Sequence, residues 1–128
     1  MEVGVVIGAD NQPIFWHLPE NRTGGSLPDS RKLWDVLWEN RGTLLGVAHS
    51  HPGDGLPIYS YTDSTTFAAI ESALGRRLDW WITSETHMIL VRWVGPDRLS
   101  YGITAVEVEP GWANELRKLS GQEGKVSQ

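Results

Sequence analysis

The sequence of 128 residues contains no cysteine. This absence excludes disulfides, thiol nucleophiles and zinc sites built from cysteine ligands. The chain also lacks any apolar run of the roughly 20 residues that a membrane-spanning helix needs. Its first residues show neither the basic segment nor the cleavage site of a signal peptide, so we expect a cytoplasmic protein without a membrane partner.

Basic residues are scarce, with 11 Lys and Arg against 16 Asp and Glu, which gives a formal charge of -5 at pH 7. Such a chain has no overall attraction for a phosphate backbone, so we expect no nucleic-acid partner. The length predicts one domain, residues 1–120, followed by a polar tail, residues 121–128. Tryptophan, in contrast, is frequent, with 7 residues. These side chains are expected in the core or, alternatively, on a face that binds a partner.

Segments typical of strands and of helices are mixed along the chain. Short runs rich in β-branched and aromatic residues predict strands over 3–7, 13–18, 43–48, 79–83, 88–94 and 99–108. Apolar residues at helical spacing predict three helices, over 30–41, from 60 or 62 to 74, and from 110 to 119. Because short turns join several neighbouring strands, we expect an α/β sandwich: a mixed, mostly antiparallel sheet with helices on its faces.

The first two predicted helices each carry an apolar stripe. That of the first helix consists of Leu33, Trp34, Leu37 and Trp38, after Ser30 as the N-cap and before Gly42 as the stop. That of the second helix consists of Phe67, Ile70, Ala73 and Leu74, with Ser60 or Thr62 as the N-cap and Gly75 at the end. We expect these stripes to face the sheet.

His49 and His51 stand where the third predicted strand ends. Side chains at positions i and i+2 of a strand point to the same face, so the two imidazoles can converge on one cation. A catalytic zinc site takes three protein ligands and one water. Asp63 is the candidate third ligand, because it opens the next predicted helix, where the helix dipole favours a carboxylate.

Other interpretations of this region remain open. Two histidines at a strand end also occur without a metal, and the chain would then be a structural domain with no cofactor. Asp54 extends the pattern to His-x-His-x-x-Asp, as in metallo-β-lactamases, but the adjacent Asp-His pair of that pattern is missing. Tyr59 and Tyr61 either pack in the core or line a substrate groove. His17 alternates with apolar residues, which indicates a half-buried residue of the sheet.

The segment His49-Ser50-His51-Pro52, followed after a loop by Ser60-Tyr61-Thr62-Asp63, resembles the H-x-H-P and S-x-x-D signature of the JAMM/MPN metalloprotease family, also called JAB or Mov34-type domains. The segment Glu2–Gly8 is similar to the first core strand of that family, and 18–21 to the end of the strand after it. The resemblance is to compact prokaryotic JAB-like forms and spans roughly residues 1–105. It implies a three-layer α/β/α sandwich around a curved sheet of the cytidine deaminase-like type.

The resemblance also implies a role for each residue of the signature. His49, His51 and Asp63 would bind Zn²⁺, and Ser60 would help hold the oxyanion of a tetrahedral intermediate. Glu2 is the residue that approximately matches the general base of the family. It stands one position closer to Gly4 than the family pattern has it, and strict alignment on the glycine puts Met1 there. The loop between His51 and Ser60 is one residue longer than usual, which a loop tolerates.

The expected activity is therefore hydrolysis of a peptide or isopeptide bond by a zinc-activated water. The implied substrate is a protein or peptide, such as the C-terminal tail of a ubiquitin-like or sulfur-carrier-like protein. The alternative is a zinc-binding but catalytically weak module of MPN type that acts through protein interaction.

Overall fold

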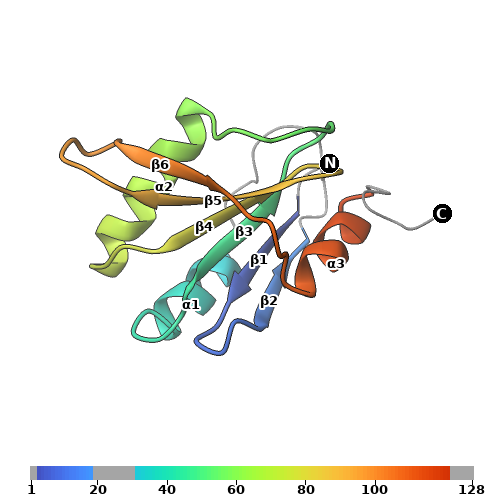
Figure 1. The fold of residues 1–128 in the computed structure, drawn as a ribbon. Coiled ribbons are helices and arrows are strands. Elements are labelled where there is room, and N and C mark those ends of the chain that lie inside the picture. Colours follow the sequence, from blue (N-terminus) through green and yellow to red (C-terminus); the bar gives the residue numbers. More distant parts are fainter. Residues whose placement is uncertain (1–2, 19–30, 122–128) are drawn as a thin grey trace.

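A computed structural model describes residues 3–18 and 31–121 of the chain. Within these residues a six-stranded sheet has the strand order β2-β1-β3-β4-β5-β6 (Figure 1). The strands are β1 (Gly4–Ile7), β2 (Pro13–His17), β3 (Gly46–Ser50), β4 (Asp79–Thr83), β5 (Met88–Trp93) and β6 (Tyr101–Ala105). The helices described are α1 (Arg31–Glu39), α2 (Tyr61–Leu74) and α3 (Trp112–Leu119).

The sheet is mixed, as the sequence predicted. Strands β3 and β4 are parallel, and every other neighbouring pair of described strands is antiparallel. The parallel pair is joined by a crossover that contains α2, whereas β1 and β2 form a hairpin. The hairpin turn includes Asn11, which has a φ of 62°, a left-handed conformation that asparagine tolerates. The crossover brings the start of α2 to the same end of the sheet as the carboxyl end of β3.

Helices cover both faces of the sheet, because alternate residues of each strand point to opposite faces (Figure 1). On one face, Leu37 of α1 and Phe67 of α2 belong to a core cluster that includes Val47 and Trp80 of the sheet. On the other face, Leu116 of α3 belongs to a second cluster with sheet residues that include Val5, Ala48 and Trp81. The prediction of an α/β fold with helices on the faces of a mixed sheet is confirmed.

Most tryptophans pack in or against these two clusters. Trp80, Trp81 and Trp112 are buried, and Trp16, Trp34 and Trp93 pack against the core in part. Trp38 differs from the prediction: it is 52% exposed, and the Arg41 guanidinium lies 3.8 Å from its ring centroid. The stripe of α1 therefore buries Leu37 but not its neighbour Trp38.

The α2 stripe and the last strand also differ from expectation. Ala73 is exposed, whereas Glu71 is buried at 3% exposure. Hydrogen bonds from other elements to the Glu71 carboxylate replace its contacts with water. The spacing of apolar residues along a helix cannot predict partners that are distant in the sequence. Strand β6 is shorter than predicted, and Val108 is 89% exposed beyond its end.

Several predictions concern residues outside the described ranges. These predictions are the general base Glu2, the N-cap Ser30, the loop over 19–28 and the polar tail from residue 122. The predicted strand end over 18–21 also lies outside the described residues, except for Leu18. Among the helices that are described, none has the length and apolar character needed to cross a membrane.

Candidate metal centre

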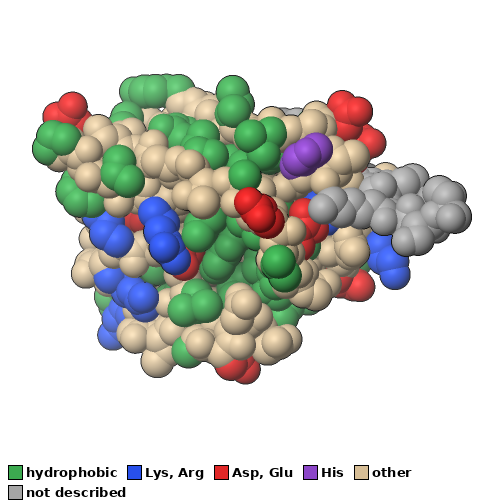
Figure 2. Space-filling model, viewed as in Figure 1, with side chains coloured by type: hydrophobic (Ala, Val, Ile, Leu, Met, Phe, Trp, Pro, Cys, Tyr) green, Lys and Arg blue, Asp and Glu red, His purple; other side chains and the backbone are tan. Residues whose placement is uncertain are grey.

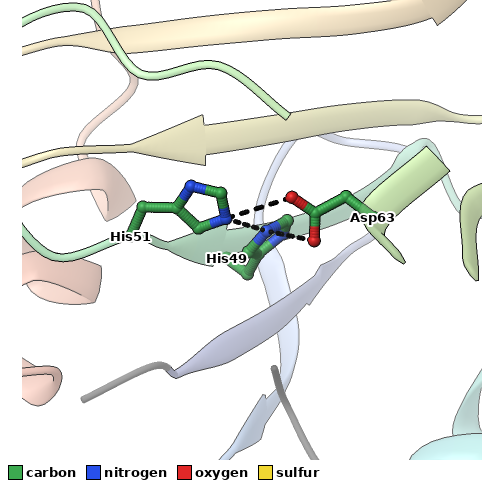
Figure 3. Close-up of side chains that lie close together, drawn as sticks. All are labelled: His49, His51 and Asp63. Atoms are coloured by element: carbon green, nitrogen blue, oxygen red, sulfur yellow. Dashed lines mark hydrogen bonds and ion pairs between the residues drawn. The ribbon is translucent and has the colours of Figure 1, made fainter. Parts of the chain in front are cut away.

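His49 and His51 come from the end of β3, beside the parallel strand β4. Gly4 of β1 pairs with His49, and Ile82 of β4 lies opposite His49 on the other side. The backbone N–H of His51 donates to the Thr83 carbonyl at 2.7 Å, so the pairing continues one residue past the strand. This extended backbone places both rings on the face covered by α2, as Figure 3 shows.

Asp63 is positioned by the N-terminus of α2. The Ser60 hydroxyl accepts a hydrogen bond from the Asp63 backbone N–H at 3.0 Å, and the Ser60 N–H donates to Asp63 Oδ2 at 2.9 Å. This reciprocal pair is a capping box, and it identifies Ser60 rather than Thr62 as the N-cap. The S-x-x-D half of the signature therefore has a local structural role in addition to any chemical one.

The ligand atoms of His49, His51 and Asp63 lie within 4.8 Å of one another. The two Nε2 atoms of the histidines are 3.0 Å apart. Asp63 Oδ1 lies 3.5 Å from His49 Nε2, and Asp63 Oδ2 lies 3.2 Å from His51 Nε2 (Figure 3). The sequence predicted this set of three residues, and the structure brings them together.

The donor set fits a cation. A neutral imidazole nitrogen without a proton is an acceptor, and an ionised carboxylate only accepts. The two Nε2 atoms, 3.0 Å apart, can share one N–H···N hydrogen bond when one of the rings carries its proton there. When neither Nε2 carries a proton, both nitrogens are acceptors beside an ionised carboxylate. A metal ion between the three side chains satisfies all of these lone pairs at once.

The cluster is shielded from solvent but not closed. The side chain of His49 is 8% exposed, that of His51 20% and that of Asp63 13%. Burial raises the pKa of the Asp63 carboxyl, but hydrogen bonds and charge interactions with both histidines, together with the Ser60 N–H, outweigh burial and hold that pKa well below its ordinary value. Asp63 is therefore ionised and available as a ligand.

The loop between His51 and Ser60 is fastened to the turn that joins β4 and β5. The Glu85 N–H donates to the Gly53 carbonyl at 2.8 Å, and the Gly55 N–H donates to the Thr86 hydroxyl at 2.8 Å. Gly53 and Gly55 have φ values of 97° and 82°, which side chains disfavour. These contacts hold the loop in one conformation between β3 and α2, the two elements that carry the cluster.

The remaining candidate residues divide between core and surface. Tyr59 packs against the core, and its hydroxyl donates to the Tyr101 carbonyl at 3.0 Å. Tyr61 is 75% exposed, so the two tyrosines have different environments. Asp54 is exposed and does not belong to the cluster. Glu2 lies outside the described residues, so its role stays a prediction.

His17 is more buried than the sequence indicated, at 4% exposure. Gly4 pairs with His17 on one side and with His49 on the other, so both histidines lie on the same face of the sheet. Strands are about 4.8 Å apart, which puts the two Cα atoms roughly 10 Å from each other, with a glycine between them. The registers of β1 with β2 and with β3 identify His17 as a neighbour of His49. The sequence around His17 alone does not predict this pairing.

The chemistry available to the cluster is that of a cation site with two nitrogen donors and one carboxylate. It lies at the carboxyl end of β3 and the N-terminus of α2, where its ligands come from two elements fixed by the crossover. Comparison of the sequence with protein-family models and with curated proteins gives no match to this chain. A function is therefore inferred from the residues themselves.

Proposed function

We propose that this chain is a zinc-dependent peptidase or isopeptidase of the JAMM/MPN type. The observation that carries the proposal is the convergence of His49, His51 and Asp63 within 4.8 Å. The α/β fold with helices on both faces of a mixed sheet is compatible with the three-layer sandwich of that family. The signature residues His49 to Asp63 support the family assignment by resemblance.

Zinc is the metal that the donor set favours. Two imidazoles and one carboxylate are a ligand set found in catalytic zinc sites, whereas Ca²⁺ and Mg²⁺ take mainly oxygen ligands. When bound, zinc lowers the pKa of its coordinated water to about 7 and polarises a carbonyl oxygen. Three protein ligands leave room for water and substrate, and the 20% exposure of the His51 side chain is consistent with access.

Two further residues supply proton transfer and hydrogen bonding in this proposal. Glu2 acts as the general base that takes a proton from water and delivers it to the leaving amine. The described chain begins at Val3, whose N–H donates to Ser50 Oγ at 3.0 Å, between the two histidines. The Ser60 hydroxyl accepts from Asp63 and keeps its own proton to donate to a developing oxyanion.

The proposed substrate is a protein or peptide with an extended tail, such as the C-terminal tail of a ubiquitin-like or sulfur-carrier-like protein. Strand β2 is an edge of the described sheet and lies next to β1, which pairs with β3. An extended tail added to a sheet edge gains main-chain hydrogen bonds. Such binding fixes the orientation of the tail relative to the sheet that carries the cluster.

Zinc stoichiometry is the first test. We expect about one zinc per chain in the parent protein and its loss in Asp63→Ala. Asp54→Ala is the matched control, because Asp54 is an exposed carboxylate outside the cluster, on the loop that leads to α2. A parent protein that retains no zinc after loading would overturn the proposal, as would equal loss of zinc in both variants.

Cleavage of fusions to ubiquitin-like proteins is the second test. We expect Glu2→Gln to keep zinc and to lose activity by about 10²–10⁴-fold, the usual contribution of a general base. A zinc-loaded parent protein that cleaves no fusion would favour the catalytically weak interaction module instead. The observation that favours this interaction module is that Glu2 stands one position closer to Gly4 than the general base of the family pattern does.

A further inference from the structure

A cavity of about 470 Å³ lies at the C-terminal end of α2, and Arg76, Arg77 and Arg98 contribute to its lining. Figure 2 shows basic side chains gathered at the left edge of the molecule, the side on which α2 runs into β4 in Figure 1. Asp63 and Gly75 are twelve positions apart, so the end of the cavity at Gly75 is about 18 Å along α2 from Asp63. It is therefore separate from the site of the proposed function.

The positive charge of this cavity is only partly neutralised. Glu71 is the one acidic side chain in its lining, and Arg77 donates to it at 2.9 Å. No carboxylate of the described residues forms an ion pair with Arg76 or Arg98 within 4.0 Å. Three guanidinium groups and one carboxylate give the lining a net charge of +2, in a chain whose net charge is -5. The excess is thus local and runs against the charge of the whole protein.

Two of the three guanidinium groups, those of Arg76 and Arg77, are held by other groups of the protein before any ligand arrives. Arg77 lies over the Trp93 ring, 3.9 Å from its centroid. Arg76 donates to the Arg41 carbonyl at 3.1 Å. The loop that carries Arg98 is fixed at the preceding residue, because the Trp93 indole donates to the Asp97 carbonyl at 2.8 Å. Such preorganisation reduces the entropy lost on binding.

The remaining wall is made of small residues, Ala68, Ser72 and Gly75. Gly75 has a φ of 75° and ends α2, so the chain turns there and directs Arg76 and Arg77 away from the helix. The volume is within the range of small-molecule sites. The shape therefore favours a compact ligand rather than a polymer.

We propose that this cavity binds a small molecule that carries a phosphate group. A phosphate monoester has a charge of about -1.5 to -2 at pH 7, which matches the net charge of the lining. A phosphate group has three acceptor oxygens, so it can accept pairs of hydrogen bonds from two guanidinium groups, whereas a carboxylate has two oxygens and a single charge. Arg76 and Arg98 are the principal contacts, because Arg77 is already engaged by Glu71 and Trp93.

Calorimetric titration with phenyl phosphate at 0.15 M salt tests this site. Benzoate is the comparison compound, because it has the same phenyl ring but carries a carboxylate in place of the phosphate. We expect saturable binding of one phenyl phosphate per chain, and at least about tenfold weaker binding of benzoate. Arg76→Ala and Arg98→Ala should each weaken phenyl phosphate binding by about tenfold. Lys118→Ala is the control, because it removes one exposed positive charge from α3 on the opposite face of the sheet.

Three results would overturn the proposal. These are the lack of saturable binding, equal binding of benzoate, and an equal loss in Lys118→Ala, which would indicate diffuse attraction. A phosphoserine peptide that binds at least tenfold more tightly than phenyl phosphate would also overturn it, because the ligand would then be a phosphorylated protein. If Arg76→Ala unfolds at a lower temperature than the parent protein, Arg76→Lys and Arg98→Ala carry the comparison.

Discussion

Helix α2 carries a carboxylate near each end, and the two have opposite kinds of surroundings. Asp63 near the N-terminus faces two histidine nitrogens that are 3.0 Å apart. Glu71 near the C-terminus accepts hydrogen bonds from Leu78 N–H at 2.9 Å and Trp80 Nε1 at 2.8 Å, and also from the Tyr101 hydroxyl and Arg77. Both residues lie on the same helix, so the difference comes from what the rest of the fold brings to each end.

The comparison separates a structural carboxylate, Glu71, from a candidate metal ligand, Asp63. Around Glu71 the groups named above all donate protons, and a carboxylate surrounded by donors is satisfied without a metal. Burial raises the pKa of the Tyr101 hydroxyl well above its ordinary value, with Glu71 acting in the same direction, so Tyr101 stays a donor. Around Asp63, each histidine Nε2 acts as a donor or as an acceptor, depending on the tautomer of the ring. The group of His49, His51 and Asp63 could therefore hold a cation, whereas the Glu71 carboxylate is satisfied without one.

The largest effect is expected from Glu71→Ala. This change leaves the Trp80 indole, the Tyr101 hydroxyl and the Leu78 N–H without their acceptor, and an unsatisfied buried donor costs about 1–3 kcal/mol. We expect the free energy of unfolding to fall by about 4 kcal/mol, measured by urea denaturation. Glu115→Ala on α3 is the exposed control, expected within about 0.5 kcal/mol of the parent protein. Equal small changes in both variants would refute a structural role for Glu71.

Asp63→Ala should act on zinc rather than mainly on the fold. Loss of a ligand is expected to weaken zinc binding by more than about 100-fold, since residues that only support a ligand already contribute 10–100-fold. In the parent protein, zinc at 100 times its Kd should raise the free energy of unfolding by about 2.7 kcal/mol. Denaturation with and without zinc measures this increment. If the increment persists in Asp63→Ala, then Asp63 is not a ligand.

Tyr101→Phe removes one hydrogen bond to the Glu71 carboxylate while keeping the ring that packs edge-on against Phe67. A hydrogen bond to a charged group contributes about 1.5–3 kcal/mol, so we expect a loss of about 2 kcal/mol in urea denaturation. Zinc binding should be unchanged, because Tyr101 belongs to the Glu71 end of the helix. A change in zinc affinity without a change in stability would contradict the separation of the two ends.

Ser60→Ala should have the smallest effect on stability. Removal of the N-cap hydroxyl from α2 is expected to lower the free energy of unfolding by about 1 kcal/mol, whereas Ser60→Gly should lower it by only a few tenths. Both variants lack the hydroxyl, so both should lose cleavage activity to the same extent if Ser60 donates to the oxyanion. Activity that follows stability instead would assign Ser60 to capping alone.

Much of the fold was predictable because its signals are local. The strand over 79–83 has the predicted bounds, and the hairpin of β1 and β2 follows from apolar runs around a short turn. The histidines at i and i+2 share a face for the same local reason. Ala73 and Trp38 were assigned to the core wrongly, because spacing reports which face of a helix is apolar but not how far the neighbouring element extends over it.

The sequence by itself determined most of the elements, the shared face of the two histidines and the position of Asp63 at the start of a helix, since each depends on residues within one turn or strand. Only the tertiary structure decided which polar groups meet. The crossover from β3 through α2 to β4 brings Asp63 to the histidines and Trp80 to Glu71. The pairing of β6 with β5 places Tyr101 within reach of the same carboxylate. The physical reason is that these contacts join separate elements, so they exist only when the packing of the whole sheet and its helices has placed both partners.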